Sequence, residues 1–194
     1  MLEPGCYYHV FNQGNARERI FFRRENYMYF LKKLDKYLDG YVEIFAFCLL
    51  SNHFHLLIRL KEGKQILDKA IGNEELNSFI KRYRSSDNLA GLIVSESFRR
   101  LFLSYSKAIN KQQKRTGSLF RKNFKRLKIE NDKYLKQLVL YIHRNPSHHG
   151  FKIDCKDYPW SSYNKILNEK ITKLRKREVL EWFEGREDFI AMHR

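Results

Sequence analysis

The chain has 194 residues, of which 43% are hydrophobic and 15% aromatic, and its formal net charge of +16 indicates a polyanionic partner, most commonly nucleic acid. No apolar run is long enough to span a bilayer, and the three cysteines lie far apart without a Cys-x-x-Cys pair, which excludes a membrane span, a zinc ribbon and a disulfide framework. We therefore expect a cytoplasmic, nucleoid-associated protein of bacterial type with one main domain, a short appendage and no membrane partner.

The first sixty residues predict a strand, a helix and a hairpin. Residues 7–12 are typical of a strand, and Gln13-Gly14-Asn15 follows as a turn. Apolar residues recur at helical spacing over residues 24–38. Residues 41–50 are almost wholly apolar, and a tight Ser51-Asn52 connection leads into a strand over residues 53–60. We expect this hairpin to lie in the centre of a sheet.

His53-Phe54-His55 begins the second strand of that hairpin. Successive side chains alternate across a strand, so both imidazoles face the same side, roughly 6 to 7 Å apart. Two neutral imidazoles placed in this way can share one divalent metal ion. Packed or half-exposed histidines are the commoner explanation of this spacing, so a second element is needed to decide between the two.

The middle of the chain is less regular. Residues 65–79 predict a helix, and residues 84–89 resemble a polar loop. Residues 95–113 predict a longer helix that Thr116-Gly117 ends, and residues 119–129 predict a long, partly irregular strand.

A basic segment covers residues 99–129, which contain no Asp or Glu. Its aromatic residues interleave with eleven cations, a mixture expected of a groove that follows phosphates and stacks unpaired bases. The alternative is a solvated basic face above core aromatics. The predicted nucleic-acid-binding residues are Arg99, Arg100, Lys107, Lys111, Lys114, Arg115, Arg121, Lys122, Lys125, Arg126 and Lys128.

A helix with an N-cap at Asn131 or Asp132 is predicted to end at Asn145, because Pro146 disfavours its continuation. Tyr141 and Asn145 are four residues apart and so share one helix face. A phenol and an amide oxygen could therefore approach one site, although a core tyrosine and a capping asparagine fit the same pattern.

The element order predicts an α+β fold, in which a ferredoxin-like split β-α-β antiparallel sheet carries an added helix with Tyr141 and a C-terminal helical tail. The tail includes an amphipathic helix over residues 177–189, and Trp160 is expected to anchor it in the core. We expect residues 1–150 to form the main domain and residues 151–194 a tail that packs on it.

Five motifs in order resemble the single-tyrosine HUH transposases, in particular the REP-associated tyrosine transposases of the IS200-like group. These motifs are Tyr8-His9-Val10 with Gly14-Asn15, Asn52-His53-Phe54-His55-Leu56-Leu57, Thr116-Gly117-Ser118-Leu119-Phe120-Arg121, Tyr141-Ile142-His143-Arg144-Asn145-Pro146, and Pro159-Trp160-Ser161-Ser162-Tyr163. Gln13, Leu50 and Ser51 stand where that family more often has Arg, Met and Pro, which puts DNA contacts or turn geometry in question rather than the chemistry.

The resemblance implies a catalytic HUH domain in residues 1–150. It implies that His53, His55 and Asn145 bind Mg²⁺ or Mn²⁺, and that Tyr141 is the nucleophile. The implied activity is nicking and rejoining of single-stranded DNA, beside a hairpin, through a 5′-phosphotyrosine. The implied assembly is a monomer or a homodimer.

Two other functions remain open from the sequence. One is a relaxase or rolling-circle initiator on the same scaffold, and the other is a domesticated DNA-binding regulator without catalysis.

Among the other histidines, His9 is expected to be a packing residue, and His143 is expected to be structural or to face DNA. A functional role for His148 and His149, expected in a loop after Pro146, is less favoured.

Overall fold

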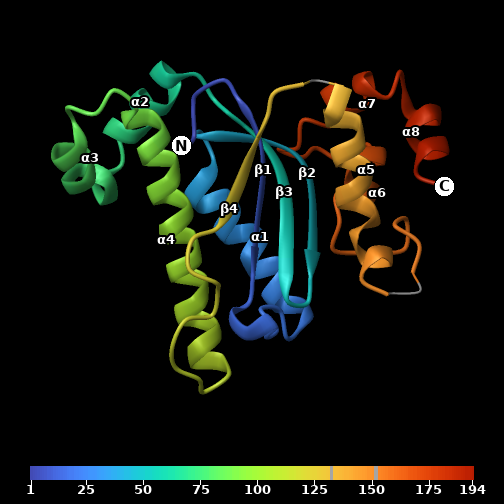
Figure 1. Ribbon diagram of the computed structural model, residues 1–194, viewed down its shortest axis with the longest axis horizontal. Coiled ribbons are helices and arrows are strands. Elements are labelled where there is room, and N and C mark those ends of the chain that lie inside the picture. The colour runs from blue at the N-terminus through green and yellow to red at the C-terminus, as the bar shows by residue number, and fades with distance from the viewer. Residues whose placement is uncertain (132, 151–152) are drawn as a thin grey trace.

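The computed structural model describes residues 1–131, 133–150 and 153–194, and its centre is a four-stranded antiparallel sheet (Figure 1). The strands are β1 (Tyr7–Gln13), β2 (Val42–Leu50), β3 (His53–Leu60) and β4 (Lys125–Ile129). Their spatial order is β2-β3-β1-β4, which is the order of a ferredoxin-like split β-α-β sheet. The predicted α+β fold class is therefore confirmed.

Helices cover the two faces of the sheet. On one face, α1 (Arg24–Leu38) and α4 (Leu89–Gln112) share a hydrophobic cluster with inward residues of the sheet, such as Phe54 and Leu56. On the other face, α5 (Lys133–His148) packs on β2 and β3, beside α6 (Tyr163–Leu167), α7 (Lys176–Trp182) and α8 (Arg186–Met192) (Figure 1). No described helix is both long and apolar enough to cross a membrane.

The hairpin forms as predicted, but only β3 is central, because β2 lies at the sheet edge. The tail explains why an edge strand is so apolar. Leu49 N donates to Trp160 O at 2.9 Å, and Ser162 N donates to Phe47 O at the same distance. The tail thus supplies backbone partners to the free edge of β2, which would otherwise be a template for aggregation.

The helix predicted over residues 65–79 is divided into three elements. They are α2 (Gly63–Ile71), the 3₁₀ turn η2 (Glu74–Leu76) and α3 (Asn77–Tyr83), and the first break comes at Gly72, where α2 ends. A further 3₁₀ turn, η1 (Asn15–Arg17), occupies the predicted turn after β1.

Helix α4 begins six residues before the predicted start at Ser95. The Oδ1 atom of Asn88 accepts a hydrogen bond from Gly91 N at 2.9 Å, which caps the helix at Leu89. The helix ends at Gln112, before the predicted stop at Thr116-Gly117. Two residues after this end, Lys114 takes the left-handed conformation with a φ of 51°. The predicted strand over residues 119–129 was too long, since Asn123 has a φ of 63° and the strand begins only at Lys125.

Helix α5 runs through Pro146 to His148 instead of ending at Asn145. The proline removes only one hydrogen bond within the last turn, so the helix tolerates it there. At the other end, Asn131 Oδ1 accepts from Lys133 N at 2.9 Å, whereas the alternative cap Asp132 lies outside the described residues. The tail helix predicted over residues 177–189 is two helices, α7 and α8, which meet at Gly185 with a φ of 130°.

The tail is attached to α5 by a buried hydrogen-bond chain through His143, which is fully buried and therefore does not face DNA. Its Nδ1 lies 2.8 Å from His193 Nε2, and its Nε2 lies 2.7 Å from Ser162 Oγ. Trp160 stacks on Tyr27 with 4.4 Å between the ring centroids, as expected of an anchor. The boundary at residue 150 stays a prediction, because tail residues share one core cluster with α5 and β2.

Replacing His143 with alanine should lower the free energy of unfolding by about 3 kcal/mol, because two buried polar partners lose their hydrogen bonds and a cavity forms. Urea denaturation monitored by circular dichroism measures this change. Lys136→Ala on the same helix is the control, since it removes only an exposed ion pair to Glu184. Equal stability of the two variants would contradict a structural role for His143.

Candidate active site

The start of β3 and the last two turns of α5 bring four predicted side chains together. The rings of His53 and His55 are perpendicular, with 5.2 Å between their centroids, and Tyr141 lies 5.6 Å from His55 by the same measure. Asn145 is fully buried, one helical turn after Tyr141. Tyr141 itself is 40% exposed, so its hydroxyl can be reached by a large substrate.

A fixed tautomer is imposed on His53 by its neighbour Asn52. Asn52 Nδ2 donates to Arg17 O at 3.3 Å, which orients the amide so that its Oδ1 faces the imidazole. His53 Nδ1 lies 2.7 Å from that Oδ1 and must therefore carry the hydrogen and donate. It follows that Nε2 of a neutral His53 has a free lone pair.

That lone pair faces a second acceptor. His53 Nε2 lies 3.0 Å from Asn145 Oδ1, and the buried Nδ2 of Asn145 has no hydrogen-bond partner among the described residues. Two acceptors that face one another without a hydrogen between them are unfavourable. A divalent ion with octahedral bonds of about 2.1 Å has neighbouring ligand atoms about 3 Å apart, so this pair fits a metal ion. Without an ion, a rotated amide would instead donate to Nε2.

His55 is held by His9, which the sequence predicted only as a packing residue. Both rings are buried, and the distance between His55 Nδ1 and His9 Nε2 is 2.9 Å. If His55 Nδ1 donates in this contact, His55 Nε2 is left as a metal ligand. The signal that could have identified His9 is the alternation of β1, which places His9 and Phe11 on the same face as His55.

Burial keeps these imidazoles neutral. Desolvation lowers the pKa of His9 to about 4 and lowers the pKa of His53, and it also lowers the pKa of His55, to which the neighbouring His9 adds. A neutral imidazole is the form that binds a metal ion. In the part of the chain that the structure describes, no three His, Cys, Asp or Glu side chains form a metal-binding group, so a metal ion at His53 and His55 would need a third protein ligand of another kind, such as the Asn145 amide.

The other two histidines lie at the end of α5. His148 is the last residue of that helix, with its ring centroid 5.7 Å from that of Tyr141. His149 is exposed, and its ring centroid is 4.5 Å from that of His53. The backbone N–H of His149 donates to Asn145 O at 3.2 Å, so His149 contacts a proposed ligand residue through the main chain.

An uncovered part of the sheet adjoins Tyr141. Helix α5 packs on β2 and β3, whereas the same face of β1 and β4 carries Phe11, Lys125 and Leu127. Leu127 is 56% exposed beside His9, and Phe11 stacks on His55 with 5.5 Å between the centroids. This surface, which we call the β1–β4 platform, offers apolar and aromatic contacts and a cation to a strand that approaches Tyr141.

The predicted basic residues are spread over several surfaces rather than one groove. Some lie on α4, some in the loop before β4, and Lys125, Arg126 and Lys128 on β4 itself. Four of the eleven form ion pairs that the acid-free run did not predict, because the acids come from elsewhere in the chain. These pairs are Arg99 with Glu96, Arg100 with Glu75, Arg115 with Glu18, and Lys128 with Glu3.

Comparison with known proteins supports the resemblance found in the motifs. No protein-family model matches the chain. A protein of Haemophilus influenzae named "Putative REP-associated tyrosine transposase" is 28% identical over 133 residues, which are 66% of this chain and 63% of that protein. The chain therefore matches less than two thirds of that relative's length.

A solved structure shares the fold. It is a REP-associated tyrosine transposase bound to a REP hairpin, with a TM-score of 0.59 and 20% sequence identity, over 86% of this chain and 82% of that one. The resemblance to REP-associated tyrosine transposases is thus confirmed by the sequence relative, and the fold by the solved structure.

Proposed function

We propose that the protein nicks and rejoins single-stranded DNA beside a hairpin, with Tyr141 as nucleophile and a divalent metal ion at His53, His55 and Asn145. The single observation that carries the proposal is the pair of facing acceptors, His53 Nε2 and Asn145 Oδ1, 3.0 Å apart and one helical turn from an exposed tyrosine. The hairpin substrate is inferred from the solved relative, which is bound to a REP hairpin.

The chemistry is a transesterification. A bound Mg²⁺ or Mn²⁺ would act as a Lewis acid that polarises the scissile phosphate. Tyr141 Oη attacks phosphorus in line and loses its proton, the bond from phosphorus to the 3′-oxygen breaks, and that oxygen leaves as a hydroxyl after taking up a proton. The products are a 5′-phosphotyrosine and a free 3′-hydroxyl. Attack on the phosphotyrosine by another 3′-hydroxyl reverses the reaction and joins strands without ATP.

The chain orients both partners of this reaction. Asn145 and Tyr141 share one face of α5, so the rigid helix keeps the nucleophile at a constant distance from one ligand. The β1–β4 platform guides the strand, with bases against Phe11 and Leu127 and a phosphate near Lys125. His9 holds the His55 ring in the tautomer and orientation that metal binding needs.

His9→Leu is expected to weaken Mn²⁺ binding by about 10- to 100-fold. This is the usual loss of metal affinity when the residue that hydrogen-bonds to a ligating histidine is removed. Isothermal titration of the protein with Mn²⁺, in the absence of DNA, measures the change. His9→Gln retains an acceptor and should recover part of the affinity. His148→Ala is the control, since His148 lies near Tyr141 without contacting a ligand. Unchanged Mn²⁺ affinity in His9→Leu would remove His9 from the site.

A direct test of the function uses hairpin DNA with a single-stranded flank. Incubation with Mg²⁺ or Mn²⁺ should produce a covalent protein–DNA adduct that survives a denaturing protein gel and disappears with a chelator. Tight binding without adduct or cleavage would instead favour a DNA-binding regulator.

A further inference from the structure

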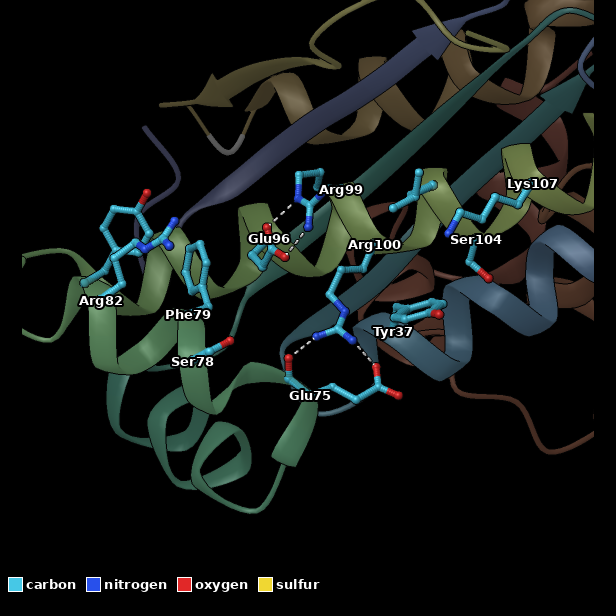
Figure 2. Close-up of a pocket in the computed structure, with 12 residues that line it drawn as sticks. Tyr37, Glu75, Ser78, Phe79, Arg82, Glu96, Arg99, Arg100, Ser104 and Lys107 are labelled. Carbon is cyan, nitrogen blue, oxygen red and sulfur yellow. Dashed lines mark hydrogen bonds and ion pairs between the residues drawn. The ribbon is translucent and has the colours of Figure 1, made fainter. Parts of the chain in front are cut away.

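A pocket of about 780 Å³ lies between α1, α3 and α4, on the face of the sheet opposite Tyr141 (Figure 2). Tyr37 comes from α1, Phe79 and Arg82 come from α3, and Arg99 and Lys107 come from α4. None of the chemistry proposed above uses this pocket.

Two ion pairs build the pocket wall. Arg100 on α4 binds both the carboxylate and the carbonyl oxygen of Glu75, which ties η2 to α4. Arg99 makes two hydrogen bonds of 2.7 Å to Glu96 on its own helix, and Figure 2 shows both pairs as dashed lines. With these four charges matched, Arg82 and Lys107 are left, and neither forms an ion pair with any described residue. The pocket thus has an excess of positive charge available to an anion.

The pocket also contains aromatic and apolar side chains that a simple anion would not need. The rings of Phe79 and Tyr83 are 4.6 Å apart. Tyr83 is 39% exposed and Leu103 is 45% exposed, so two large apolar side chains face solvent beside the two free cations. An aromatic surface beside cations suits a ligand with both a flat ring and a phosphate.

The exposed stripe of α4 links this pocket to the basic segment. Arg99, Leu103 and Lys107 recur every four residues and line the pocket on one side. The same three residues line a second hollow of about 610 Å³ on the other side of the helix, together with Arg121, Phe124 and Arg126. A single strand could therefore cross α4 between the loop before β4 and the α3 pocket.

We propose that the α1/α3/α4 pocket is a second contact site for single-stranded DNA, which takes a short run of unpaired nucleotides with a base on Phe79 and Tyr83 and with different phosphates of the strand on Arg82 and Lys107, at opposite ends of the pocket (Figure 2). The choice of DNA as the ligand rests on the proposed function, but the site does not require the metal or Tyr141. It extends the DNA footprint from the sheet to the opposite helical layer.

The test compares oligo-dT strands of about 8 and about 30 nucleotides, which bracket the usual footprint of one single-strand-binding unit. Fluorescence anisotropy should show that Arg82→Ala and Tyr83→Ala each bind the long strand roughly tenfold more weakly than the unchanged protein does. The short strand should bind the variants and the unchanged protein with similar affinity, because the β1–β4 platform is intact in all of them. Arg82→Ala should also reduce the slope of log affinity against log salt concentration by the amount expected for about one phosphate contact. Tyr83 is exposed, so its loss should leave the thermal melting curve unchanged.

Arg177→Ala is the matched control, because it removes one positive charge from an α7 side chain that is 93% exposed and does not line the pocket. Equal losses in Arg82→Ala and Arg177→Ala would overturn the proposal, since they would show only an effect of net charge. The proposal would also be overturned if oligo-glutamate displaced the long strand in a manner that depended on Arg82 but was unchanged in Tyr83→Ala. That result would favour an acidic peptide as the ligand. Adduct formation is scored separately, so failure of the nuclease activity and failure of this site are distinguishable.

Discussion

Tyr141→Phe is expected to abolish the covalent protein–DNA adduct while hairpin DNA binding stays within about twofold of the unchanged protein. The substitution removes one oxygen atom and keeps the ring, which is 40% exposed and contacts His9 and His55 through its edge. Among the described residues, no tyrosine other than Tyr141 is recorded in ring contact with His9, His53 or His55 on this face of the sheet, so no second nucleophile should replace it. The measurements are a denaturing gel for the adduct and anisotropy for binding.

Tyr134→Phe is the control for this experiment. Tyr134 lies on the same helix seven residues earlier and is 49% exposed, so it has a similar setting without a place beside the histidines. It should form the adduct at the normal rate. An adduct of normal yield in Tyr141→Phe would disprove the assignment of the nucleophile.

Asn145→Leu is expected to reduce the nicking rate at least about 100-fold and to weaken Mn²⁺ binding, because it removes the proposed oxygen ligand and the partner of His53 Nε2. Single-turnover cleavage and Mn²⁺ titration measure the two effects. If Asn145 only capped or packed the helix, the variant would lose stability without a selective loss of metal binding.

Asn145→Asp separates the two roles. It keeps an oxygen at the same place, so it should retain Mn²⁺ binding, yet it buries a carboxylate that needs a cation. The melting temperature of Asn145→Asp should therefore rise with added Mn²⁺ more than that of the unchanged protein. A melting temperature that does not respond to Mn²⁺ would exclude Asn145 as a ligand.

The candidate site combines a tyrosine on a well-packed helix with a surface that is open on one side. Helix α5 is held from behind by the tail through His143, while the β1–β4 platform stays uncovered next to Tyr141. A structure of this kind can accept a long polymer from the side without a lid. The tail therefore supports the proposed chemistry by positioning α5, although it supplies no residue to the reaction.

Short-range patterns in the sequence were sufficient for most of the candidate site. Alternation along β3 placed His53 and His55 on one face, and the four-residue spacing on α5 placed Tyr141 beside Asn145. Both periods are properties of a single element, so no other part of the chain had to be known. The fold class followed from the order of the elements, because few topologies join them without crossing, but the place of β2 at the sheet edge did not.

Contacts between distant segments could be decided only by the tertiary structure. His9 meets His55 because β1 pairs with β3, and the tail covers the edge of β2 from more than a hundred residues away. The acid-free run predicted one groove, but α4 turns its cations to different sides, and acids from other segments pair with several of the basic residues. A one-dimensional charge pattern does not contain the direction of a side chain or the approach of a distant partner, and these two quantities determine which cations remain available to DNA.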